Sequence, residues 1–100
     1  MEFQGKHVVV IGTKRSGIAA IELLLQEGAH VTAMDAEPQP IPGLSIPVVA
    51  QKPELLGNPD LIVVSPAVPT DLPMLNEARM EGVPVIGEVE LASYYLKGPA

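Results

Sequence analysis

The segment that most constrains the fold is HVVVIGTKRSG, which runs from His7 to Gly17. A short run of β-branched residues leads into Gly12, and after four further residues Gly17 opens an apolar stretch with helical spacing. A strand, a tight glycine turn and a helix start, in that order, bring backbone N–H groups and the positive end of a helix to one place. The segment therefore predicts a site for a phosphate-bearing ligand.

The same turn departs from the dinucleotide fingerprint G-x-G-x-x-G, because Lys14 stands at the middle glycine. That glycine normally lets the backbone approach a pyrophosphate, so Lys14 disfavours the usual pose of NAD or FAD. Gly17 is not followed by Lys and Ser or Thr, so the turn is not a P-loop and direct ATP binding is not expected. An ordinary structural turn is the alternative interpretation.

Several residues near the turn have two interpretations. Lys14 and Arg15 either face a diphosphate or are solvated charges at a helix start, and Ser16 either caps the helix or bonds a phosphate. Asp35 ends a predicted strand, where it would bond a sugar hydroxyl or a base N–H, or would simply favour a turn. The segment SPAVP, residues 65–69, follows another buried strand and would close over the ligand or form a plain turn.

Short apolar runs alternate with helical stretches along the whole chain. This pattern predicts a small doubly wound, Rossmann-like α/β domain, with a parallel sheet of about five strands and flanking helices. The proline-rich segment EPQPIPGLSIP is expected to be a surface loop, and one helical turn is expected over Pro53–Leu56. The predicted strands are His7–Ile11, His30–Asp35, Val48–Val49, Leu61–Val64 and Val83–Ile86. The predicted helices are Ser16–Glu27 with a Gly28 C-cap, Leu72–Glu81 with an Asp71 N-cap, and Glu88–Leu96.

Composition narrows the class of protein further. The chain is 47% hydrophobic but 3% aromatic, which suits strands buried on both faces by helices. The absence of cysteine excludes disulfides and thiolate metal sites, and His7 and His30 are not expected to form a metal site. A net charge of −6 argues against non-specific binding to nucleic acid, and no apolar run approaches a membrane span. The start of the chain does not resemble a signal peptide, and the absence of cysteine is compatible with the cytoplasm.

Catalytic groups are sparse in this sequence. There is no cysteine and no histidine near an acid, and Glu88 and Glu90 are two residues apart, so they do not face each other on a helix. Both acids are interpreted as partners of a helix dipole. The chain alone does not have the residues of a complete enzyme.

Four segments together resemble the N-terminal domain of the Mur ligases, the cytoplasmic enzymes of peptidoglycan synthesis. They are Gly12–Ala19 (GTKRSGIA), Asp35, Asp60–Pro69 (DLIVVSPAVP) and Gly87–Leu91 (GEVEL), and they occur in this order over essentially the whole chain. GEVEL resembles the D-glutamate-adding members most.

This resemblance implies that residues 1–97 form a domain that binds the UDP part of UDP-N-acetylmuramoyl-L-alanine. Residues 98–100 would begin a linker to a central domain, which would hold ATP and Mg²⁺ in the parent ligase. This domain would need no cofactor, no nucleic acid and no membrane, and its other partners would be the remaining domains of the ligase. The parent would join an acid to a D-amino acid at the expense of ATP.

The resemblance also implies a set of UDP-binding residues. Along the diphosphate it places Gly12, Thr13, Lys14, Arg15 and Ser16; on the uracil side Asp35, Ala36 and Glu37; and in the next loop Ser65, Pro66 and Ala67. Two departures stand out, because the family often has a hydroxyl or basic residue after the acid and usually has glycine where Ala67 stands. An NAD(P)-binding domain of a dehydrogenase or sensor, and an interaction module without a ligand, are the alternatives.

Overall fold

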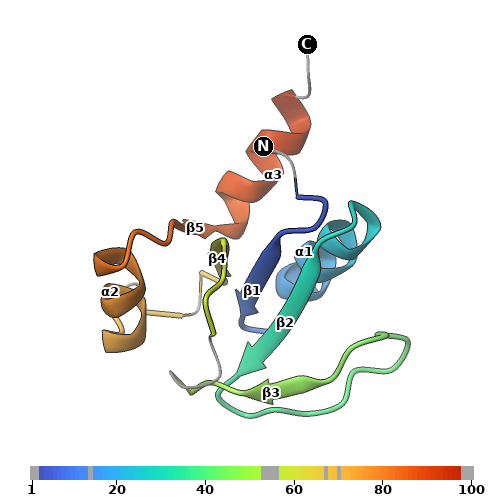
Figure 1. Ribbon diagram of the computed structural model, residues 1–100. Helices are drawn as coiled ribbons and strands as arrows, with labels where there is room; N and C mark the ends of the chain where they lie inside the picture. The colour runs from blue at the N-terminus through green and yellow to red at the C-terminus, as the bar shows by residue number, and fades with distance from the viewer. Residues whose placement is uncertain (1–2, 14, 53–56, 67, 70, 98–100) are drawn as a thin grey trace.

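In a computed structural model, the chain folds around a five-stranded sheet in which each strand runs parallel to its neighbours (Figure 1). The structure describes residues 3–13, 15–52, 57–66, 68–69 and 71–97. The strand order is β3-β2-β1-β4-β5, and the predicted fold class is confirmed. The strands are β1 (His7–Ile11), β2 (His30–Asp35), β3 (Val48–Ala50), β4 (Leu61–Val64) and β5 (Val85–Gly87).

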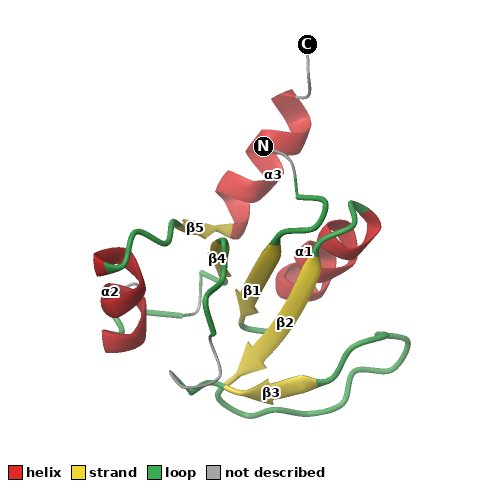
Figure 2. Cartoon of the chain, viewed as in Figure 1, coloured by secondary structure: helices red, strands yellow, loops and turns green. Residues whose placement is uncertain are grey.

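Helices cover both faces of the sheet (Figure 2). One face packs against α1 (Arg15–Gln26) and α3 (Glu88–Lys97), and the other packs against α2 (Pro73–Met80). Successive residues of β1 point to opposite faces, so Val8 and Val10 join the first core and Val9 and Ile11 the second, all with no exposed surface. This double burial is why β1 beyond His7 and the whole of β4 are continuous apolar runs in the sequence, whereas β2 is fully buried only at Ala33 and Met34.

Helix α1 ends as the sequence predicts, with Gly28 in the left-handed region at φ 85°. The Gly28 N–H donates to the Leu25 carbonyl at 3.1 Å and the Ala29 N–H to the Leu24 carbonyl at 3.0 Å. This pair of bonds is a Schellman motif, which satisfies carbonyls that the helix leaves free.

The same motif at the end of α2 explains why the last strand begins later in the chain than predicted. The Gly82 N–H donates to the Arg79 carbonyl at 3.0 Å, and the Val83 N–H donates to the Ala78 carbonyl at 2.9 Å. Val83 therefore bonds to the helix, and Pro84 has no N–H to donate to a sheet. The strand predicted over Val83–Ile86 is wrong in position, since β5 begins at Val85 and takes in Gly87, the expected turn residue.

The start of α2 also differs from the prediction. Asp71 is not the N-cap; Leu72 holds that position, and no side chain there bonds a backbone N–H. Pro73 explains the shift, because its fixed φ suits the first helical residue and its missing N–H needs no cap. Asp71 is left one residue too early to act as a cap.

The expected proline-rich loop connects β2 to β3 in place of a helix (Figure 1). It is mostly exposed, but Leu44 and Ile46 are half-buried and pack against the core beneath α1. The helical turn expected over Pro53–Leu56 lies outside the described residues. In the part of the chain that the structure describes, no helix has the length and apolar character needed to cross a membrane.

Gly17 sets how closely α1 approaches the end of β1. A Cβ added there would lie 1.9 Å from the Gly12 carbonyl oxygen, which is backbone and has little freedom to move. We expect Gly17→Ala to lower the free energy of unfolding by about 2–3 kcal/mol in denaturant titration, because the helix must shift. Gly87→Ala is the matched control, since nothing lies within 4 Å of the added carbon, and it should change stability by less than about 0.5 kcal/mol. Equal effects of the two changes would contradict this role of Gly17.

Candidate functional site

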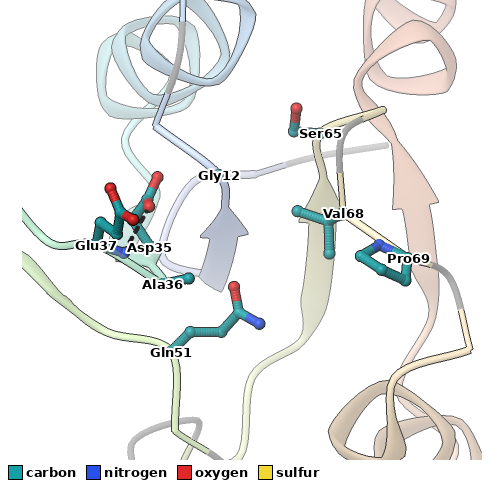
Figure 3. Close-up of a pocket in the computed structure, with 8 residues that line it drawn as sticks. All are labelled: Gly12, Asp35, Ala36, Glu37, Gln51, Ser65, Val68 and Pro69. Carbon is teal, nitrogen blue, oxygen red and sulfur yellow. Dashed lines mark hydrogen bonds between the residues drawn. The ribbon is translucent and has the colours of Figure 1, made fainter.

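A cavity of about 350 Å³ opens at the carboxyl edge of the sheet, where four strands end (Figure 3). This edge is where ligands bind in open parallel sheets, at the crevice where the strand order reverses. Here the reversal falls between β1 and β4. The lining residues are Gly12, Asp35, Ala36, Glu37, Gln51, Ser65, Val68 and Pro69.

Gly12 brings the ends of β1 and β4 into contact at the centre of the site. Its φ is 98°, and an added Cβ would lie 2.6 Å from the Ser65 Cβ, so no side chain fits in the observed geometry. The Gly12 N–H donates to the Met34 carbonyl at 2.8 Å, and the Ser65 N–H donates to the Ile11 carbonyl at 3.0 Å. Ser65 is buried by this packing.

The Asp35 carboxylate joins the glycine turn to the end of β2. Its Oδ2 accepts hydrogen bonds from the Thr13 backbone N–H at 2.9 Å and from the Thr13 hydroxyl at 2.7 Å. Its Oδ1 accepts from the Glu37 N–H at 2.9 Å. Asp35 therefore has a structural part in holding the turn, whatever it also offers to a ligand.

The Thr13 N–H is already engaged by Asp35, so it is not available to an anion. The leading N–H groups of α1, from Arg15 onward, have no partners within the helix and carry its positive end. These groups are the part of the turn that suits a phosphate. Lys14 and Ala67 lie outside the described residues, as do the side chains of Arg15 and Ser16, so their assigned contacts stay predictions.

Glu88 departs from its interpretation as a plain helix-dipole acid. It is 8% exposed, and neither carboxylate oxygen has a hydrogen-bond partner among the described residues. Its Oε1 faces the start of α1, at 3.5 Å from where a Gly17 Cβ would lie. Glu90, by contrast, is exposed and accepts a hydrogen bond from the Gly87 N–H at 3.3 Å.

The structure gathers most, but not all, of the described candidate residues around one cavity. Gly12, Asp35, Ala36, Glu37 and Ser65 line it, and Thr13 bonds to Asp35. Pro66 instead lines an apolar groove between α1 and α3, together with Leu23, Val89 and others.

Sequence reasoning missed one lining residue, Gln51, whereas Val68 and Pro69 belong to the 65–69 segment that was expected to close over a ligand. Gln51 comes directly after β3 and Val68 belongs to the loop after β4. Both positions follow the rule that ligand sites form at the carboxyl ends of parallel strands, and the short strand β3 is the signal that could have marked Gln51.

The described residues contain no group of three or more His, Asp or Glu side chains arranged to hold a metal ion. His7 pairs with His30 across β1 and β2, and its Nε2 lies 2.9 Å from the Thr32 hydroxyl. Both histidines are at the amino edge of the sheet, opposite the cavity.

Fold and cavity together define the Rossmann-like class of parallel α/β domains. Solved structures agree: apo D-lactate dehydrogenase from Escherichia coli matches with a TM-score of 0.59 and 26% identity, over 87% of this chain and 29% of that one. Salmonella D-lactate dehydrogenase matches with the same TM-score and 28% identity, over 87% of this chain and 28% of that one.

Residues 6–87 match the family described as Mur ligase MurD-like, N-terminal domain, and the chain belongs to this family. UDP-N-acetylmuramoylalanine–D-glutamate ligase from Solibacter usitatus is 50% identical over 98% of this chain and 23% of that protein. The enzyme of the same name from Acidobacterium capsulatum is 47% identical, with the same two coverages. The chain thus spans about a quarter of the length of these relatives.

The contrast between Glu88 and Glu90 predicts opposite effects of removing their charges. Glu88 has no hydrogen-bond donor among the described residues, and burying such a carboxylate costs about 1–3 kcal/mol or more of folding free energy. This cost exceeds the roughly 0.3–1 kcal/mol by which a nearby helix N-terminus stabilises a negative charge. We expect Glu88→Gln to raise the free energy of unfolding by about 1 kcal/mol, and Glu90→Gln to lower it by about 0.5 kcal/mol because the bond from Gly87 weakens. Thermal unfolding measures both, and a loss of stability in each variant would contradict the account of Glu88.

Proposed function

We propose that this domain binds the UDP part of UDP-N-acetylmuramoyl-L-alanine. In the whole protein it would act as the N-terminal domain of an ATP-dependent ligase that adds D-glutamate during peptidoglycan synthesis. The reaction would take place on domains beyond this chain, which would hold ATP and Mg²⁺. The cytoplasm would be the site of action.

The observation that carries the proposal is the cavity at the crevice between β1 and β4. It joins the glycine turn, the end of β2 and the Ser65 loop, which are three of the four segments that carry the resemblance to Mur ligases. Relatives at 47–50% identity are named for a reaction on a UDP-linked substrate.

Groups of opposite charge lie close together at this edge of the sheet. The start of α1 offers N–H groups and a partial positive charge, which suit the diphosphate. The carboxylates of Asp35 and Glu37 lie at the end of β2, where they suit the hydroxyl and N–H donors of ribose and uracil. Since the net charge is −6, local geometry and not the global field must attract the anion.

NMR titration with UDP-N-acetylmuramoyl-L-alanine tests the proposal. Amide shifts should concentrate at Gly12, Thr13, Asp35 and Ser65, and should be small for His7 and its neighbours at the opposite edge. Weak affinity is expected, because the other domains of the ligase would add contacts. Unchanged spectra at millimolar ligand would reject UDP binding by this domain.

The role of Asp35 predicts a specific loss of affinity. Asp35→Ala removes the acceptor for Thr13 and Glu37 and an acceptor for the ligand, so UDP binding should weaken about 10- to 100-fold by calorimetry or NMR. Asp60→Ala is the matched control, since Asp60 Oδ2 also accepts a backbone N–H, that of His7 at 2.9 Å, but at the far edge of the sheet. Equal affinities for UDP in the Asp35 variant and the unchanged chain would exclude Asp35 from the site.

Binding of NAD(P) is the second candidate, because the fold is similar to that of D-lactate dehydrogenases. Lys14 in place of the middle glycine argues against it. A change of NADH fluorescence on mixing, with no response to UDP, would favour this candidate over the first.

A further inference from the structure

We propose that Gln51 recognises the edge of the nucleotide base, as a hydrogen-bonding partner of uracil. The proposal rests on the proposed function, since it names the base-reading group of the same cavity. Nothing in the sequence motifs marks this residue; its position in the fold does.

Gln51 lies beside the residues assigned to the uracil side. Its backbone N–H donates to the Asp35 carbonyl at 3.2 Å, which extends the pairing of β2 and β3 by one residue and holds the Gln51 backbone next to Ala36. In Figure 3 the Gln51 side chain points into the cavity, below Ala36 and toward Val68. The backbone of Gln51 is thus held in place while its amide is directed at the space a ligand would occupy.

The Gln51 amide makes no hydrogen bond with any described residue, although the side chain is half-buried. A half-buried amide without a protein partner loses water when a ligand fills the cavity, and then needs a partner from the ligand. The cavity wall opposite it is formed by Val68 and Pro69, which offer apolar surface for the flat face of a base.

The chemistry of the two groups is complementary. A glutamine amide presents one acceptor and one pair of donors side by side, the arrangement with which it reads base edges in nucleic acids. Uracil presents N3–H next to a carbonyl oxygen. Gln51 Oε1 would accept from N3–H while Nε2 donates to the neighbouring carbonyl, so that both groups of the amide are satisfied.

The test combines a variant with a modified ligand. Gln51→Met keeps the length of the side chain but removes both hydrogen-bonding groups, and N3-methyl-UDP removes the donor on the base. UDP should bind about tenfold more weakly to the Gln51→Met chain than to the unchanged chain in NMR titration. N3-methylation should cost the unchanged chain a similar factor and should cost the variant little, because the lost bonds are the same ones.

Two controls separate recognition from folding. Gln39→Met makes the same change in the exposed proline-rich loop, outside the cavity lining, and should leave UDP affinity unchanged. Inorganic pyrophosphate should bind the Gln51 variant as well as it binds the unchanged chain. If the unchanged chain binds UDP and the N3-methyl penalty persists in the Gln51 variant, the assignment of Gln51 is overturned while the proposed function stands. If the unchanged chain does not bind UDP, both are overturned.

Discussion

The contact between the start of α1 and the end of β1 is the constraint on which the site depends. With only hydrogen at Gly17, the helix backbone approaches the Gly12 carbonyl more closely than any side chain would allow. That approach aims the positive end of α1 at the crevice between β1 and β4. Gly12 in turn packs on Ser65 in a left-handed conformation, so the end of β1 and the loop after β4 meet at one cavity.

Asp35 completes this arrangement from the neighbouring strand. By accepting both the N–H and the hydroxyl of Thr13, its carboxylate couples the end of β2 to the glycine turn. In a Rossmann-like site an acid at this position is expected to meet a ribose. Here the same acid holds the glycine turn in place, and this preorganisation would reduce the cost of ordering the turn for a ligand.

Two acids at the carboxyl edge of the sheet, Asp35 and Glu88, differ in their hydrogen bonding. Asp35 is satisfied by backbone and hydroxyl donors, whereas Glu88 is buried against the start of α1 and accepts no hydrogen bond from the described residues. A carboxylate beside a helix N-terminus partly offsets the charge that would attract a phosphate. The domain therefore combines a geometry suited to an anion with a local field that would limit how tightly an anion could be held.

Hydrophobic pattern and turn chemistry were enough to predict the strands β1, β2 and β4 with the bounds that the structure has. For β1 and β4 the reason is burial on both faces, which shows in the sequence as an apolar run. They also predicted the end of α1 at Gly28 and the position of Asp35 at the carboxyl edge of the sheet. They did not predict that Val83 would bond to α2, that Glu88 would be buried, or that Gln51 would face the cavity. The burial of Glu88 and the position of Gln51 depend on which elements become neighbours after folding, through the packing of α3 on α1 and the pairing of β3 with β2. The Val83 bond is instead local, because it reaches back five residues to the Ala78 carbonyl at the end of α2. The sequence by itself thus determined most of the helices and strands and the glycine turn between β1 and α1. Tertiary packing decided the partners of the side chains, because their burial and hydrogen bonding depend on segments that are distant in the chain.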